Sequence, residues 1–468
     1  MGDVRHNCSI SVTHNLPDAY DFLKAQDHRG PDASGIGALR ADGLVDTVTW
    51  TGSIGAFDIE GLQELFPNTY TFFFSHGRYA TRGSDVPLLD EAHPITIGGE
   101  HYPNHAENGR MHRIVRGARA AVIHNGQVPS LGYTDLETRV DSEQLLRYYL
   151  DHGPERTMRD VALAYTAVFA DASGLRVMRD RSGIKPGVLG VKNRREYVVA
   201  SEDVAIRKNH ARVVENLEPG TIYELHPDRM PTKTRVLEPQ TKRCFFEWMY
   251  ISHLDTILDD RSVRSLREHV GRTLADEIAP DADFVTFLPR SPETAARSYA
   301  NARGLDFETV FYKLNKKRSF LEPNQKAREK SIEKNLFIKP EMRDVLEGRR
   351  VIIIDDSIVR GTNSRHLSKL LSNTGVEHAY LLSCTPRIGI IGDDGEPRGC
   401  EWGVDMPPDS EFIARDADTA QNRSARDISR IVGLDVRYLS VDGLKRSYQD
   451  AGINPETLCT FCIGGPRP

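Results

Sequence analysis

The pattern of apolar and polar positions differs between two regions of the chain. Over the first 230 residues, short apolar runs bounded by turn residues predict strands. Helical periodicity between them predicts helices at DAYDFLKAQ and DSEQLLRYYL. This mixture favours layered sheets flanked by helices. The predicted strands include TFFFSHGRYAT, AVIHNG, LAYTAVFAD, EYVVASEDVAI and GTIYEL.

From about residue 262 helices and strands alternate. The predicted helix SVRSLREHVGRTLADEI precedes the strand DFVTFLP, the helix ETAARSYANARG, the strand VIIIDD with its own helix, and AYLLSCTP. This is the βαβ pattern of a parallel sheet. The polar, weakly patterned stretch TKTRVLEPQTKR separates the two regions and is a plausible connector. At 468 residues the chain is also too long for one core.

The segment VIIIDDSIVRGTNSR (351–365) carries the most specific chemistry. Val351 to Ile354 form a buried strand, and the carboxylates of Asp355 and Asp356 stand at its carboxyl end, before a small hydroxyl-rich loop that opens a helix. Ligands of open α/β sheets bind at that edge, and N–H groups at a helix start attract phosphate. These parts predict a sugar-phosphate site with a metal. A plain strand–turn–helix crossover explains the apolar run and the turn, but not the paired acids.

Composition narrows the class of protein. Charged residues make up 27% and the net charge is −6, so no polybasic face indicates nucleic acid. A run of about 18 apolar residues, which a membrane span needs, is absent, and MGDVRHNC lacks the apolar core of a secretory signal. We expect a cytoplasmic protein with neither nucleic-acid nor membrane partners. In that reducing compartment the six cysteines do not predict disulfides.

Cys8 begins a series of ordered motifs. Alone, a cysteine near the start is incidental, but HRGPDASGIG, SHGRYATRGSD, IHNGQV and DSEQLL follow it in order. They resemble the glutamine-binding blocks of N-terminal-nucleophile amidotransferases. In such enzymes an N-terminal cysteine attacks the side-chain amide of glutamine, and its own α-amino group acts as the base. The pKa of a free α-amino group is about 7.7–8.0. The resemblance therefore implies a propeptide, residues 1–7, cleaved after Asn7.

The same resemblance assigns roles to individual residues. Asn125 and Gly126 would form the oxyanion hole. Arg78, with its neighbour Tyr79, would bind the glutamine carboxylate, and Asp141 its α-ammonium group. Without the block order, Arg78 reads as a surface ion pair, Asp141 as a helix N-cap and HNG as a hairpin turn.

Nearly the whole chain resembles the amidophosphoribosyltransferase family. The 351–365 segment is similar to its phosphoribosyl pyrophosphate (PRPP) signature, and CFFEWMYISHLDTILDDRSV, WGVDMP and YLSVDGL are similar to further blocks. The implied fold is an α+β N-terminal-nucleophile (αββα) glutaminase domain plus an α/β type I phosphoribosyltransferase domain. The expected boundaries are the propeptide 1–7, the glutaminase domain 8–231, a connector 232–262, the phosphoribosyltransferase domain 263–399 and a cluster-binding tail 400–468.

The resemblance also implies a Mg²⁺ site and a pyrophosphate loop. Asp355, Asp356 and Ser291 would hold the metal, a hard cation that prefers oxygen ligands. Arg290 and Pro292 stand where the family has an acidic residue and glycine. Pro292 lacks an N–H donor, so the pyrophosphate grip is either altered or supplied by Arg290. The PRPP-binding set is Asp355, Asp356, Ser357, Arg360, Gly361, Thr362, Asn363 and Ser364.

The basic stretch 313–335 has two interpretations. It is either a solvated loop or a lid that brings positive charge over a polyanionic ligand. Within it, NKKRSF (315–320) departs from the family pattern.

Cys459 and Cys462 have the spacing of metal ligands. From the residues alone, a zinc site, a redox dithiol and reduced buried cysteines all remain open. By resemblance, Cys244, Cys400, Cys459 and Cys462 would bind a structural 4Fe-4S cluster, in a branch of the family that also has propeptides. Cys384 is expected in the core.

The implied reaction converts glutamine, PRPP and water to 5-phosphoribosylamine, glutamate and pyrophosphate, the first step of de novo purine (IMP) biosynthesis. The family also implies a homo-oligomer, tetramer or dimer, and inhibition by purine nucleotides. The unusual LPRSPET loop motivates one alternative, a paralogue that aminates another phosphosugar. The other is a non-catalytic PRPP or nucleotide sensor.

Overall fold

The computed structural model describes residues 8–79, 88–103, 105–107, 110–136, 138, 140–162, 164–314, 335–404, 406–416 and 419–468. The chain forms two compact units. The first contains residues 1–243, 255–260 and 402–405, and the second contains 244–254, 261–401 and 406–468. The expected propeptide 1–7 and residues 315–334 of the basic stretch lie outside the described residues.

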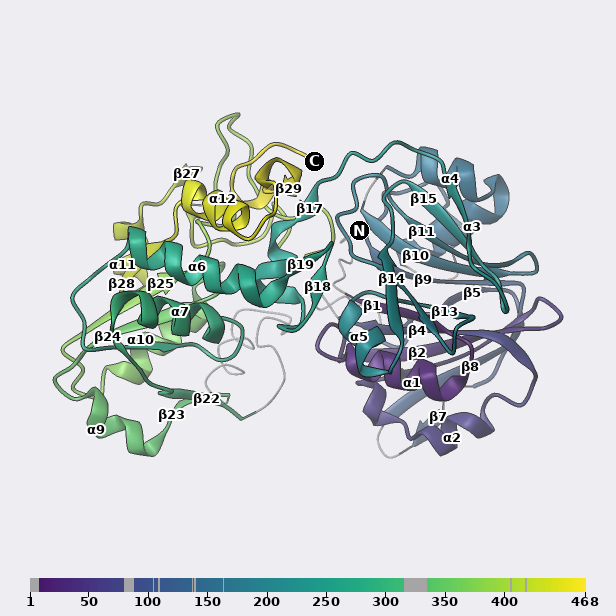
Figure 1. Ribbon diagram of the computed structural model, residues 1–468, viewed down its shortest axis with the longest axis horizontal. Helices are drawn as coiled ribbons and strands as arrows, with labels where there is room; N and C mark the ends of the chain where they lie inside the picture. Colours follow the sequence, from purple (N-terminus) through teal and green to yellow (C-terminus); the bar gives the residue numbers. More distant parts are fainter. Residues whose placement is uncertain are drawn as a thin grey trace. The chain divides into compact units, whose positions relative to one another are not determined.

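The first unit contains two antiparallel sheets (Figure 1). The larger has the order β14 (Arg212–Asn216), β12 (Val188–Lys192), β13 (Glu196–Ala200), β1 (Ser9–Thr13), β4 (Tyr70–Arg78), β2 (Ala33–Arg40), β3 (Val45–Thr51), β8 (Arg110–Ala118) and β6 (Glu100–His101), with β7 (His105–Glu107) also paired to β8. The smaller has the order β16 (Thr232–Arg235), β15 (Thr221–Leu225), β11 (Gly174–Arg179), β10 (Tyr165–Asp171), β9 (Ala120–Gly126) and β5 (Ile95–Ile97).

The two sheets pack face to face because their strands alternate buried apolar side chains. Ile10 and Phe74 of the larger sheet share a core with Ile123 and Val168 of the smaller one. Helices cover the outer faces, so the unit has four layers, helix–sheet–sheet–helix. Those on the larger sheet are α1 (Leu16–Ala25), α2 (Ile59–Glu64) and α5 (Asp203–Lys208), and those on the smaller are α3 (Asp141–His152) and α4 (Pro154–Asp160).

The second unit is built on a parallel sheet, as the βαβ pattern predicts. The order is β21 (Asp306–Phe307), β20 (Phe284–Phe287), β24 (Arg350–Asp355), β25 (His378–Ser383) and β28 (Asp435–Tyr438). The apolar run of β24 is central and fully buried, which explains why it does not alternate. The helices are α6 (Val263–Glu277), α7 (Glu293–Arg303), α9 (Arg343–Leu346), α10 (Thr362–Leu371), α11 (Ala425–Val432) and α12 (Val441–Asp450).

Short elements complete the described chain. The strands are β17 (Arg243–Cys244), β18 (Ile257–Leu258), β19 (Arg261–Ser262), β22 (Phe311–Lys313), β23 (Leu336–Ile338), β26 (Arg415–Asp416), β27 (Gln421–Asn422) and β29 (Leu458–Cys459). One π-helical turn covers Glu247–Ile251, and 3₁₀ turns cover Ile54–Ala56, Pro340–Met342, Pro455–Thr457 and Phe461–Ile463.

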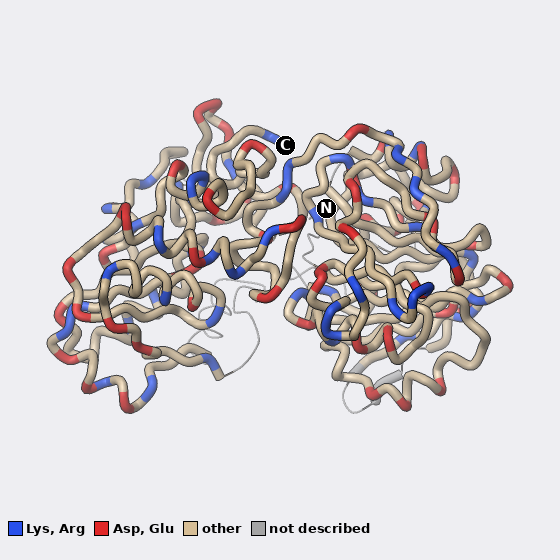
Figure 2. Tube along the Cα trace, viewed as in Figure 1, with Lys and Arg blue, Asp and Glu red and all other residues tan. Residues whose placement is uncertain are grey.

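The expected connector 232–262 is divided between the units. Residues 232–243 and 255–260 belong to the first unit, and 244–254 and 261–262 belong to the second. β16 explains part of this division, because it extends the smaller sheet by pairing with β15. Acidic and basic residues are interspersed along both units (Figure 2). None of the helices in the described ranges is long and apolar enough to cross a membrane.

Candidate active site

Cys8 is fully buried where the chain enters β1. The Nε of Arg29 donates to its carbonyl at 3.2 Å, and the backbone of Tyr79 hydrogen-bonds its thiol. Burial raises the pKa of the Cys8 thiol to about 11, although the positive charge of Arg78 opposes the shift. The thiol is therefore protonated near neutrality, and nucleophilic attack requires a base.

Arg78 ends β4, the neighbour of β1, and is fully buried. Its Nη1 donates to the backbone carbonyl of Glu91 at 3.2 Å, and its Nη2 pairs with the Glu91 carboxylate. Side-chain exposure in this pair is 1% and 3%, so the alternative of a surface ion pair is wrong. A buried guanidinium held in this way suits recognition of a carboxylate.

Asn125 and Gly126 end β9, which contacts β1. HNG therefore belongs to a strand and not to a hairpin turn. Within the part of the chain that the structure describes, both amide atoms of Asn125 are buried without a hydrogen-bond partner, as are Ser9 Oγ and Gln127 Oε1. Because buried polar atoms normally find partners, the unpaired amide of Asn125 indicates a place for a polar ligand.

Asp141 is the first residue of α3, whose N-cap is Val140, so the N-cap interpretation of Asp141 is wrong. Its Oδ2 instead accepts from the N–H of Val128 at 3.0 Å. Burial raises the pKa of this carboxyl, and the nearby His124 opposes the shift. A buried carboxylate with spare acceptor capacity suits an ammonium group.

In the second unit, Asp355 and Asp356 lie at the carboxyl end of β24. Burial raises the pKa of both carboxyls; the charge of Asp356 raises that of Asp355 further, and Lys313 lowers both. The hydroxyl of Ser291 hydrogen-bonds Asp356. The three residues expected to bind Mg²⁺ thus meet, and their oxygen donors suit a hard cation, which would also relieve the repulsion between the acids.

The loop after this pair leads into α10. Ser357 Oγ donates to Asp356 at 3.2 Å, and Gly361 takes the N-cap position with φ +71°. A β-carbon at Gly361 would lie 2.4 Å from Ile413 Cδ1, so the position needs glycine. Since glycine supplies no side-chain acceptor for the first helical turn, an anion can take that role.

The unusual loop residues also have structural roles. Pro292 takes the N-cap position of α7, where the helix has not yet begun and an imino acid is tolerated. Arg290 is exposed. The loop therefore offers a positive charge where the family pattern has an acidic residue.

The four cysteines expected to bind the cluster are buried, each 8% exposed. Burial raises the pKa of the Cys462 thiol well above its usual range, and the charges of Cys400, Cys459 and Cys244 raise it further, so the four thiols share one neighbourhood. In the described ranges no three His, Cys, Asp or Glu residues form a group able to hold a metal ion. The donor set suits a cluster, but the thiols are not arranged as ready ligands. Cys384 is buried, as expected.

Comparison with known proteins identifies the family. No family model matches the chain. The amidophosphoribosyltransferase of Methanothermobacter thermautotrophicus is 30% identical over 499 residues, which cover 100% of this chain and 95% of the relative. The chain belongs to the amidophosphoribosyltransferase family. The Pseudomonas aeruginosa amidophosphoribosyltransferase is 30% identical, over 89% of this chain and 83% of its own. The chloroplastic amidophosphoribosyltransferase 2 of Arabidopsis thaliana is 29% identical, over 99% and 80%.

Solved structures agree with this family. One, described as the allosteric regulatory enzyme of purine biosynthesis, aligns with a TM-score of 0.79 and 26% identity over 98% of this chain and 96% of that chain. Glutamine PRPP amidotransferase from B. subtilis, complexed with ADP and GMP, aligns with a TM-score of 0.75 and 26% identity over 98% and 97%. The predicted fold class, an N-terminal-nucleophile glutaminase domain plus a type I phosphoribosyltransferase domain, is confirmed.

Several buried charges of this amidophosphoribosyltransferase family member were not predicted. Arg29 pairs with Glu202 at 2.6 Å, and Lys185 donates to the carbonyl of Gly403 at 3.3 Å. Arg29 lies inside the HRGPDASGIG block, which was the available signal. Lys185 and Glu91 lie outside the quoted sequence blocks, so neither residue gave a signal.

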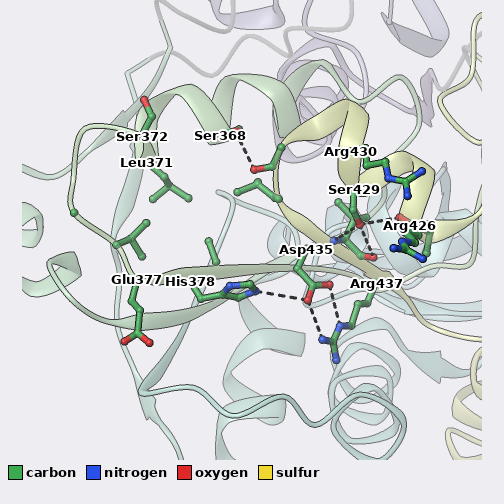
Figure 3. Close-up of a pocket in the computed structure, with 17 residues that line it drawn as sticks. Ser368, Leu371, Ser372, Glu377, His378, Arg426, Ser429, Arg430, Asp435 and Arg437 are labelled. Atoms are coloured by element: carbon green, nitrogen blue, oxygen red, sulfur yellow. Dashed lines mark hydrogen bonds and ion pairs between the residues drawn. The ribbon is translucent and has the colours of Figure 1, made fainter.

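A separate hollow of about 890 Å³ lies in the second unit, between α10, α11 and the beginnings of β25 and β28 (Figure 3). Among its lining residues, Asp435 pairs with both Arg437 at 2.9 Å and His378 at 3.6 Å. It lies at the amino ends of the strands, opposite the carboxyl end that bears Asp355. The hollow is therefore not part of the candidate site.

Replacing Gly126 tests the oxyanion assignment. Its φ is +149°, and a β-carbon would lie 2.1 Å from the carbonyl oxygen of Ala164. We expect Gly126→Ala to reduce glutamine hydrolysis about 100-fold or more, because an oxyanion donor moves, and to destabilise the fold by about 1–3 kcal/mol. Glutamate release and urea unfolding measure both effects. Gly55→Ala, with no atom within 4 Å of the added methyl, is the control, and an unimpaired Gly126→Ala enzyme contradicts the assignment.

Acid should destabilise the first unit through His76. Burial and the charge of Arg78 lower the pKa of this fully buried histidine from 6.5 to about 3. Between these values the unfolded chain binds the extra proton, so the stabilisation is complete above pH 6.5 and is lost as the pH falls toward 3. The slope is at most about 1.4 kcal/mol per pH unit. Denaturant unfolding between pH 4 and 7 should show a shallower slope for His76→Asn than for the native chain; equal slopes contradict the prediction.

Proposed function

We propose that this protein catalyses the amidophosphoribosyltransferase reaction, in which glutamine, PRPP and water give 5-phosphoribosylamine, glutamate and pyrophosphate at the start of de novo purine synthesis. The proposal rests on the observation that one chain contains both sites. One is a buried cysteine among partnerless polar groups, and the other is an acid pair before a glycine-capped helix. The names of the relatives support the same reaction.

Cys8 is the proposed nucleophile. While residues 1–7 are attached, its nitrogen is part of a peptide bond and cannot accept a proton. Cleavage after Asn7 would free an α-amino group, whose pKa near about 8 lets it remove the proton from a thiol with a pKa of about 11 during attack. The expected propeptide is thus part of the proposal, and it is supported by the need for a base.

Glutamine hydrolysis then follows from the surrounding groups. Arg78 binds the α-carboxylate and Asp141 the α-ammonium group. The sulfur adds to the amide carbon, and the oxygen that becomes negative accepts from the Asn125 side chain and the Gly126 N–H. The C–N bond breaks, ammonia leaves with the proton taken from the thiol, and water hydrolyses the thioester to glutamate.

PRPP is proposed to bind at the acid pair. N–H groups of residues 361–364 would hold the 5′-phosphate, and Asp355 and Asp356 the ribose hydroxyls. Mg²⁺, held by Asp355, Asp356 and Ser291, would neutralise charge on the pyrophosphate. Ammonia attacks C1 of the ribose and the C1–O bond to pyrophosphate breaks, while Lys313 and Arg290 offer positive charge nearby.

The remaining expectations stand as proposals. Cys244, Cys400, Cys459 and Cys462 would hold a structural 4Fe-4S cluster, supported by their shared buried neighbourhood. A homo-oligomer, tetramer or dimer, and inhibition by purine nucleotides are supported by a solved relative described as allosteric and another complexed with ADP and GMP. A cytoplasmic location is supported by six free cysteines.

One alternative keeps the glutaminase chemistry but uses another phosphosugar. The exposed Arg290 favours it, because this charge changes the rim of the pyrophosphate loop. Product analysis with glutamine and PRPP decides between them, since rapid formation of phosphoribosylamine excludes the paralogue and also a non-catalytic sensor.

Removal of the thiol should separate the two half-reactions. We expect Cys8→Ala to abolish phosphoribosylamine formation from glutamine and to keep most of the activity with added ammonia, because ammonia enters after the thioester step. Both activities are measured by pyrophosphate release. Native-level glutamine-dependent activity in Cys8→Ala contradicts the proposed nucleophile. Loss of ammonia-dependent activity in the native enzyme contradicts the phosphoribosyl half.

Metal analysis tests the cluster. Protein purified without oxygen should contain iron and inorganic sulfide in equal amounts. Cys459→Ser should lose both and unfold at a lower temperature, because the thiolate that anchors the tail is gone. Cys384→Ala, also buried, is the control and should keep its iron. Zinc alone, or iron retained in Cys459→Ser, contradicts the proposal.

A further inference from the structure

Ser142 joins two buried histidines behind the candidate glutamine site. It lies in the first turn of α3, and its side chain is fully buried. Its Oγ lies 2.6 Å from Nε2 of His93 and 2.8 Å from Nδ1 of His124. Both imidazoles are also fully buried. The proposed reaction leaves all three side chains without a role.

The direction of each hydrogen bond in this network follows from the Glu91 carbonyl, which contacts His93. Nδ1 of His93 lies 3.1 Å from the Glu91 carbonyl, which can only accept, so this nitrogen carries the proton. With the ring proton on Nδ1, the other nitrogen, Nε2, accepts from the Ser142 hydroxyl. Ser142 Oγ in turn accepts from Nδ1–H of His124, whose pKa burial lowers, so that it stays neutral. Ser142 Oγ also lies 3.5 Å from Oδ1 of Asp141, but the contact with His93 at 2.6 Å is much shorter, so the hydroxyl proton is assigned to His93. One hydroxyl thus donates to the ring of His93 and accepts from the ring of His124.

This hydrogen-bond network connects the two residues of the proposed glutamine site, Arg78 and Asn125. At one end, the Glu91 carbonyl also accepts from Arg78, the residue proposed to bind the carboxylate. At the other end, His124 precedes Asn125, the proposed oxyanion donor, on β9.

A third histidine fixes the peptide between His124 and Asn125. Nε2 of His76 lies 3.2 Å from the carbonyl oxygen of His124, and its ring stacks on His93 with centroids 4.3 Å apart. The ring and the carbonyl of His124 are therefore held by different partners, one of which is Ser142. Little freedom remains for the backbone that carries Asn125.

We propose that Ser142 is a positioning residue for glutamine hydrolysis: its hydroxyl sets the position of the oxyanion donor Asn125, through His124, relative to the anchor formed by Arg78 and Glu91. This inference rests on the proposed function. Oxyanion stabilisation depends on donors fixed to within a few tenths of an ångström, so loss of the hydroxyl lowers kcat. KM for glutamine changes little, because the ion pair between Arg78 and Glu91 does not include Ser142, and the contact of Ser142 with Asp141 is long at 3.5 Å.

Two substitutions of His93 provide a matched test. The terminal amide of glutamine reaches the place of Nε2 and keeps the contact with Ser142. The shorter asparagine reaches the place of Nδ1 and keeps only the contact with the Glu91 carbonyl. We expect Ser142→Ala and His93→Asn each to lower the glutaminase kcat about tenfold to 100-fold, with KM changed less than about threefold. His93→Gln should retain the larger share of kcat.

The double variant with Ser142→Ala and His93→Asn should be no slower than the slower single variant. The reason is that both substitutions remove the same hydrogen bond, the one between Ser142 Oγ and the ring of His93. Thermal unfolding and ammonia-dependent activity show whether each variant is folded. If Ser142→Ala does not fold, the His93 pair still decides.

The outcomes separate the inference from the proposed function. A native enzyme without glutaminase activity overturns the proposed function itself. An active native enzyme with equal kcat in His93→Gln and His93→Asn overturns the positioning role, as does a Ser142→Ala enzyme with native kcat. A rise in KM at constant kcat also overturns it, because the effect would then lie in substrate binding.

Discussion

The glutaminase half depends on the antiparallel pairing of β1 with β4. This register sets Ser9 opposite Gly77 and Ile10 opposite His76, so the chain entering β1 brings Cys8 beside the end of β4, which carries Arg78. Backbone hydrogen bonds fix the pairing, and one residue of slip would turn every side chain to the other face. The proposed nucleophile, Cys8, and the residue proposed to bind the carboxylate, Arg78, are therefore aligned by the sheet and not by their own contacts.

Such a site buries several charges, which is costly unless each is compensated. Arg78 pairs with Glu91, and Arg29 with Glu202. Although burial alone would raise the pKa of the Glu202 carboxyl, His28 and Arg29 hold it well below its usual range. These two ion pairs compensate four of the buried charges of the unit. A glutamine zwitterion would add no net charge to them.

Local patterns in the sequence were sufficient for the main elements and also gave the acid pair of the proposed PRPP site. The apolar run of β24 and the acids after it are contiguous, so periodicity and adjacency reveal them together. The glutamine site was found by resemblance, because its residues come from separate strands. Ser142 lies inside the DSEQLL block, but its hydrogen bond with His93 gave no signal, since a partner 49 residues away is selected by the folded structure. The connector was only partly predicted, because the pairing of β16 with β15 recruits polar residues that look like a linker.

One consequence concerns how the protein can be divided. The chain passes between the units at 243/244, 254/255, 260/261, 401/402 and 405/406. Thr256 donates to Glu202 at 2.6 Å, and Lys185 reaches the carbonyl of Gly403, so late segments complete the first unit. A gene fragment that stops at residue 243 omits both. The first unit is thus built from separate segments of the sequence. During synthesis on the ribosome, Lys185 gains its partner only after residue 403 has been added.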